Sequence, residues 1–186
     1  FSSALLIVTG KERKKLYYLE GHRERDLMNL EPDSHQGFGF AATGLSRDNY
    51  NIIPFSLYAQ EEPHIEVSGD DAVAAIIIAG PTQDLIEKEI LAIDAYLKQG
   101  GRLLLLLEPN PPQTYRDLLA RWGVTIQTGF VIDEASNVAG ETQTPLITRR
   151  QYGMGGETTP VDAITNLLDQ TYFPGSASFL PALPQE

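Results

Sequence analysis

Two continuously apolar runs, joined by a segment of helical periodicity, are the feature that most constrains how this chain can fold. The first run is AVAAIIIAG at 72–80, and the second is LLLLL at 103–107. Apolar runs of strand length without alternation are typical of strands buried on both faces of a parallel sheet. Between them, apolar residues recur on one helix face, and Thr82 is suited to be the N-cap of that helix. This pattern predicts a strand–helix–strand unit with parallel strands.

Further strand-like segments alternate with helix-like ones along the chain. We therefore predict an α/β fold: a doubly wound, mostly parallel, flavodoxin-like sheet with helices on both faces. Pro54 lies inside one of these strands and places that strand at the sheet edge. The predicted strand order is 2-1-3-4-5, for strands numbered along the chain at 16–20, 50–57, 74–79, 103–107 and 124–132.

The two ends of the chain carry different patterns. Residues 3–9 are apolar and predict an N-terminal strand that forms a hairpin with 16–20. Residues 134–186 show little periodicity and predict an irregular, loop-rich extension. We expect 1–186 to be a single α/β domain, excised from a longer, membrane-anchored chain.

Composition excludes several classes of function. The chain has 186 residues, no cysteine and a formal net charge of −11. Without cysteine there is no disulfide, no thiolate metal site and no cysteine nucleophile. Such an acidic chain is not suited to bind nucleic acid or anionic lipid headgroups. No apolar run reaches the roughly 18–20 residues that span a bilayer.

A rare histidine follows the predicted strand at 16–20, in the loop EGHRER. In doubly wound sheets, ligands bind beyond the carboxyl ends of the strands where the strand order reverses. The loops that leave the first, third and fourth predicted strands therefore share one rim of the sheet. The candidate ligand-binding residues on this rim are Gly21, His22, Glu24, Gly80, Pro81, Thr82 and Glu108.

The pair His22 and Glu24 has several possible roles. A metal site would need a third ligand, such as Asp84, His35 or Glu108. A hydrolase could use His22 as base and Glu24 as the residue that orients it. A binding rim without chemistry and a plain charged loop are the remaining alternatives.

Motifs for catalysis and for cofactors are absent from the sequence. There is no G-x-S-x-G, no Walker A loop and no G-x-G-x-x-G after a strand. We therefore predict no catalytic residue, no metal and no cofactor.

Three stretches together resemble a known family: LYYLEGHRERDL, AAIIIAGPTQDLIEKEILAIDAYLKQGGRLLLLLEP and LLARWGVTIQTGFVIDEASNVAG. They are similar to the extracytoplasmic domain of GldG-type proteins, which are auxiliary components of ABC transporters. The family's Gly-His and Glu correspond to Gly21, His22 and Glu24, although the residue between them is Arg23 where the family pattern has Gly. The family's acidic-Pro corresponds to Glu108 and the proline after it.

The resemblance implies a class I glutamine-amidotransferase-like fold, related to an intraflagellar-transport domain and lacking the amidotransferase nucleophile. It also implies an extracytoplasmic location and membrane anchors outside this chain. The expected partners are ABC transporter permease and ATPase subunits or another extracytoplasmic protein, with carbohydrate as a candidate ligand. The expected function is non-catalytic binding. The alternatives are a hydrolase using His22 and Glu24, and a scaffold that docks through 134–186.

Overall fold

The computed structural model describes residues 13–31, 34–69, 72–152 and 168–181. The chain groups into two compact units. The first comprises Phe1–Leu107 with Pro111–Trp122, and the second comprises Glu108–Asn110 with Gly123–Glu186. The single-domain organisation of 1–186 stays a prediction, and the two units are described separately below.

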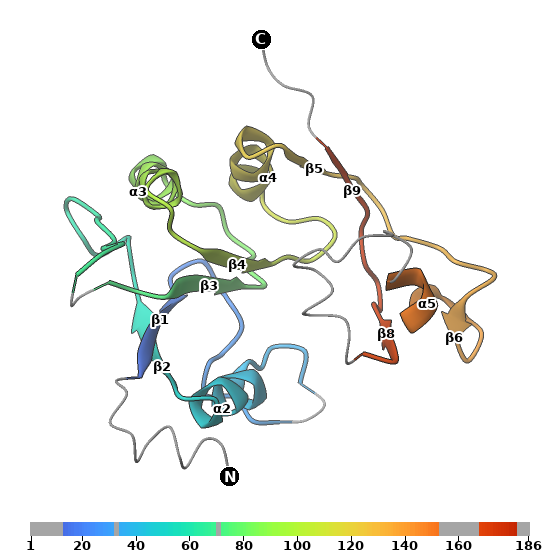
Figure 1. Ribbon diagram of the computed structural model, residues 1–186. Coiled ribbons are helices and arrows are strands. Elements are labelled where there is room, and N and C mark those ends of the chain that lie inside the picture. The colour runs from blue at the N-terminus through green and yellow to red at the C-terminus, as the bar shows by residue number, and fades with distance from the viewer. Residues whose placement is uncertain (1–12, 32–33, 70–71, 153–167, 182–186) are drawn as a thin grey trace. The chain divides into compact units, whose positions relative to one another are not determined.

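The first unit is built on a four-stranded, all-parallel sheet (Figure 1). Its strands are β1 (Lys14–Leu19), β2 (Tyr50–Phe55), β3 (Ala75–Ala79) and β4 (Leu103–Leu106). The order is β2-β1-β3-β4. This confirms the predicted α/β fold and the first four places of the predicted strand order. β2, which contains Pro54, lies at the sheet edge as expected.

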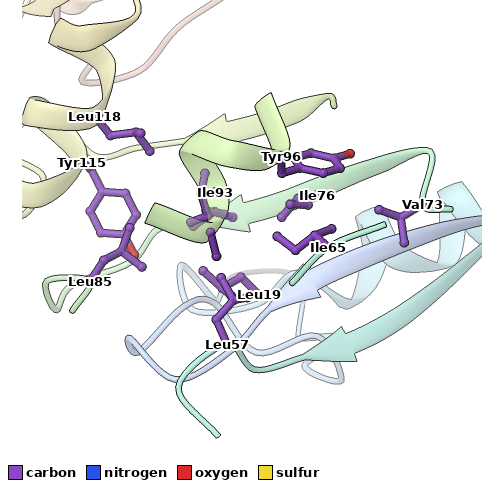
Figure 2. Packing of buried hydrophobic residues seen from close by; sticks show 12 residues of the cluster. Leu19, Leu57, Ile65, Val73, Ile76, Leu85, Ile93, Tyr96, Tyr115 and Leu118 are labelled. Carbon is purple, nitrogen blue, oxygen red and sulfur yellow. The ribbon is translucent and has the colours of Figure 1, made fainter. Parts of the chain in front are cut away.

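Helices cover both faces of this sheet, as predicted (Figure 1). Residues of opposite parity on a strand face opposite sides. Leu16 and Tyr18 pack with residues of α2 (Gly39–Arg47) in one core cluster. Leu19, on the other face, packs in a second cluster with residues of two further helices (Figure 2). These helices are α3 (Glu87–Lys98) and α4 (Gln113–Arg121).

The fourth strand is less buried than its sequence suggests. Leu104 is 46% exposed and Leu106 is 43% exposed. Both lie in register with residues of β3 that face the α2 side of the sheet. β4 is the edge strand on this side, and α2 packs over the opposite edge, against β2. The expectation of a fully buried strand was therefore wrong for these two leucines.

The fifth predicted strand leaves the sheet. β5 (Val124–Ile126) pairs antiparallel with β9 (Phe179–Pro181) in the second unit. The predicted fifth place in the parallel sheet was therefore wrong. The apolar residues of this segment find a partner strand far along the chain, and sequence periodicity cannot reveal a pairing of this kind.

The second unit contains short antiparallel sheets within its loops (Figure 1). β6 (Asn137–Val138), β7 (Glu141–Thr148) and β8 (Gln170–Tyr172) form a three-stranded sheet, and the short helix α5 (Arg149–Tyr152) follows β7. Among the described residues after 134, loops alternate with these short strands, so this part is more regular than the sequence indicated.

Two other predictions concern the first unit. β1 pairs with β2 on one side and with β3 on the other, while its predicted hairpin partner at 3–9 lies outside the described residues. Helix α3 begins at Glu87, so Thr82 is not its N-cap. Among the described residues, no helix has both the length and the apolar character needed to cross a bilayer.

Two glycines of the first unit should respond oppositely to alanine. A Cβ at Gly101 would lie 2.4 Å from the ring of buried Tyr96. A Cβ at Gly44, inside α2, would have no neighbour within 4 Å. We expect Gly101→Ala to lower the free energy of unfolding by about 1–3 kcal/mol. Gly44→Ala should raise it by up to about 1 kcal/mol through helix propensity. Chemical denaturation of both variants measures these free energies of unfolding. An unchanged free energy of unfolding in Gly101→Ala would contradict the close packing of Gly101 against Tyr96.

Candidate functional site

The loops that leave β1 and β3 lie against each other. The Arg25 N–H donates to the Ala79 carbonyl at 2.9 Å, at the end of β3. The carbonyl of His22 accepts the N–H groups of Thr82 at 3.0 Å and Gln83 at 3.1 Å. The structure thus brings the two predicted loops together at the carboxyl end of the sheet.

His22 is buried between two carboxylates. Its residue exposure is 4%, and both ring nitrogens face carboxylate oxygens. Nδ1 lies 3.2 Å from Oε1 of Glu24, and Nε2 lies 2.9 Å from Oε2 of Glu89. The Glu89 side chain is fully buried, and that of Glu24 is nearly so. We call these three residues the His22 cluster.

The same carboxylates also accept hydrogen bonds from backbone N–H groups. Oε2 of Glu24 accepts the N–H of His22 at 2.8 Å, which closes the loop on itself. Oε2 of Glu89 accepts the N–H of Ile86 at 2.9 Å, at the start of α3. Glu89 therefore makes half of a capping box, because Ile86 has no side-chain acceptor for the reciprocal bond. The His22 cluster joins the loop after β1 to the first turn of α3.

The two carboxylates favour the charged form of the imidazole. The hydrogen bond to Glu24 is the largest contribution that raises the pKa of His22 above its ordinary value of 6.5. Burial lowers the pKa of His22, and the charge of Glu89 raises it further. An imidazolium donates from both ring nitrogens, which matches the two carboxylate contacts. The His22 cluster is therefore a buried, charge-assisted hydrogen-bond network.

This arrangement leaves the imidazole little scope for chemistry. A general base needs a free nitrogen within hydrogen-bond reach of the proton that it abstracts. Here both nitrogens contact carboxylates directly. Asp84, one suggested third metal ligand, instead accepts bonds from the N–H and the hydroxyl of Thr114. Among the described residues, no group of side chains is arranged to hold a metal ion.

Sequence reasoning found His22 and Glu24 but missed Glu89. The prediction started the helix at Thr82, which placed Glu89 in the helix body. The observed helix starts after Ile86, and Glu89 is then the third helical residue. A glutamate at that position is the usual capping-box signal. Recognising the later start would have singled out this residue.

The other candidate residues shape the rim. Gly21 has φ 129° and Gly80 has φ 59°, conformations that favour glycine. A Cβ at Gly80 would also lie 2.9 Å from the side chain of Arg25. Pro81 is buried, whereas Thr82 is exposed. Glu108 groups with the second unit, so the site built from the first unit does not include it.

The pH dependence of stability tests the charge of His22. A histidine whose pKa is raised on folding stabilises the fold below its unfolded pKa, near 6.5. That contribution is lost as the pH rises through the raised folded pKa. We expect the free energy of unfolding to fall with pH above about 6.5, and His22→Gln to remove this slope. NMR titration of the ring protons should give a pKa for His22 above 6.5.

His64→Gln is the matched control for that titration. His64 is exposed and pairs with Glu66 in solvent. Its replacement leaves the contacts of the His22 cluster intact, so the slope due to His22 should persist. A His22 pKa at or below 6.5 would contradict the charged network.

Arg23, between the two predicted site residues, has a strained backbone. Its φ is 56°, a left-handed conformation that costs a side-chain-bearing residue about 1–2 kcal/mol. Arg23→Gly relieves this strain but increases the freedom of the unfolded chain. We expect a net gain in unfolding free energy of about 0.5 kcal/mol in chemical denaturation. Glu20→Gly, at an exposed neighbour without positive φ, should lose stability, and an equal loss in both variants would contradict the assignment.

A solved structure shows the same fold. The structure titled "mmIFT52 N-terminal domain" superposes with a TM-score of 0.60 and 17% sequence identity. The match covers 90% of this chain and 73% of that one. At this identity, the similarity shows the fold alone, and it agrees with the flavodoxin-like prediction.

Comparison with protein-family models adds the family. The model described as "ABC-type uncharacterized transport system" matches residues 13–186, which include the rim loops. The GldG-type resemblance of the sequence is thereby confirmed. The chain belongs to this family of auxiliary components of ABC-type transport systems.

Proposed function

We propose that this chain is a non-catalytic extracytoplasmic domain of its ABC-type transport system, and that it binds through the rim formed by the loops after β1 and β3. The partner is a permease or ATPase subunit, another extracytoplasmic protein, or a small ligand such as a sugar. Membership in the transport family supports association with transporter components. Segments outside this chain would anchor the domain to the cytoplasmic membrane.

The observation that carries the proposal is the double engagement of the His22 ring. Its nitrogens contact Glu24 at 3.2 Å and Glu89 at 2.9 Å, inside the fold. A histidine held this way is a structural support beneath the loops rather than a base at the surface. This geometry favours binding over the hydrolase alternative.

Exposed side chains on the same loops as the His22 cluster form a surface that a partner can contact. Arg23, Thr82 and Gln83 are exposed at the rim. The structure gives Arg23 no ion pair or hydrogen bond with a described residue, and its guanidinium can pair with a carboxylate or phosphate. Retaining a strained backbone at this position is typical of residues that contact partners. The rim is therefore suited to an acidic or hydroxyl-rich partner group.

A second candidate function is docking through 134–186. Several large apolar side chains are exposed in this part of the chain, and apolar surface of this kind is typical of protein interfaces. They are Tyr172, Phe173, Phe179 and Leu180.

Binding of the full-length protein to its own permease and ATPase, in detergent, distinguishes the two surfaces. We expect Arg23→Glu combined with Thr82→Glu to weaken binding about tenfold or more, which corresponds to about 1.4 kcal/mol. Arg47→Glu combined with Thr43→Glu, at two exposed positions of α2, gives the same change in charge and should have no effect. A loss confined to Tyr172→Asp and Leu180→Asp would favour the second candidate. A glycan array with the same rim variants tests sugar binding.

Catalysis needs its own measurement. The purified protein should not turn over ester, amide or glycoside substrates. Turnover that His22→Ala abolishes, in a variant shown to be folded, would contradict the proposal and support the hydrolase alternative.

A further inference from the structure

Two buried polar atoms beside the His22 cluster have no hydrogen-bond partner among the residues that the structure describes. They are Oε1 of Glu89 and the hydroxyl oxygen of Tyr115. Both residues are 0% exposed. Leaving a buried donor or acceptor unpaired costs about 1–3 kcal/mol, so native proteins rarely do so. We therefore expect each of these two atoms to form a hydrogen bond with a group other than the described side chains.

The two atoms lie in one region of the first unit. Glu89 is in the first turn of α3, and Tyr115 is in the first turn of α4. The starts of these helices are tied together, because the N–H of Leu85 donates to the hydroxyl of Thr114 at 2.9 Å. Figure 2 shows the Tyr115 ring between Leu118 and Leu85, with its oxygen directed toward Leu85.

The chemistry of the two atoms is complementary. Burial raises the pKa of Tyr115 above its ordinary value, and the charges of Glu24 and Glu89 raise it further. The hydroxyl therefore keeps its proton and is a donor. Oε1 of Glu89 is an acceptor on a carboxylate near enough for its charge to act on this hydroxyl.

The Glu89 carboxylate has little freedom to turn. Its other oxygen, Oε2, already faces His22 and accepts the Ile86 N–H, both at 2.9 Å. Rotation of the carboxylate would break its contact with His22. Tyr115 is held in turn by its place in the apolar cluster. A small group that both accepts and donates is chemically suited to pair both atoms.

We propose that a single internal water molecule binds between Tyr115 and Glu89. It accepts the hydrogen of the Tyr115 hydroxyl and donates to Oε1 of Glu89. Water is the ligand of choice because it supplies both functions in the smallest volume and commonly satisfies buried groups of this kind. This water extends the His22 cluster from the loop after β1, through α3, to α4.

Tyr115→Phe tests the site with little change in packing. Oxygen-17 relaxation dispersion counts long-lived internal waters in solution, and we expect the variant to lose one. Tyr18→Phe is the matched control, because buried Tyr18 donates directly to the Arg25 carbonyl at 2.6 Å. It should lose a hydrogen bond but no water. An unchanged water count in Tyr115→Phe overturns the proposal.

Denaturation and crystallography give independent readouts. With the water present, Tyr115→Phe leaves Glu89 Oε1 without its bridge to the hydroxyl, so the midpoint of chemical denaturation should fall. A rise in the midpoint would mean that the hydroxyl was unpaired, and it would overturn the proposal. A high-resolution crystal structure of the wild-type protein should show density for the water. A direct bond from Tyr115 to Glu89, or no density between them, would also overturn it.

Discussion

The contact of one imidazole with two carboxylates is the constraint on which the rim depends. Because His22 is buried, its charge must be met from within, and Glu24 and Glu89 meet it from two different elements. The His22 carbonyl then orders the backbone of Thr82 and Gln83. His22 therefore contacts α3 through its side chain and the β3 loop through its carbonyl. Removing either carboxylate would leave one ring nitrogen of His22 without its partner, and an unpaired buried donor typically costs about 1–3 kcal/mol.

Within the loop after β1, buried and exposed side chains alternate over three residues. His22 and Glu24 face inward, whereas Arg23 between them is exposed with a positive φ. The inward side chains stabilise the loop through their hydrogen bonds. The exposed Arg23 side chain takes no part in these bonds, so its replacement leaves them intact.

Local patterns carried the predictions that succeeded. The parallel sheet was indicated by three local features: the continuous apolar run of β3, the helical periodicity before Gly100 and the position of Pro54 in β2. Each of these can be read from residues that are adjacent in the sequence. The failures depend on contacts across the fold. Glu89 meets His22 across 67 residues, and β5 pairs with a strand more than 50 residues later. Nothing local marks β9 as the partner of β5. The position of Glu89 becomes a local capping signal only once the later start of α3 is known.

The central position of β1 has a consequence for how the chain folds during synthesis. β1 is the first described strand, yet it pairs with β2 on one side and with β3 on the other. Its pairing with β3 waits until residues up to 79 have left the ribosome, well after β2 is available. The parallel sheet is then complete at residue 106, before β5 emerges. Because β5 joins a different sheet, the amino-terminal core can close while the rest of the chain is still being made.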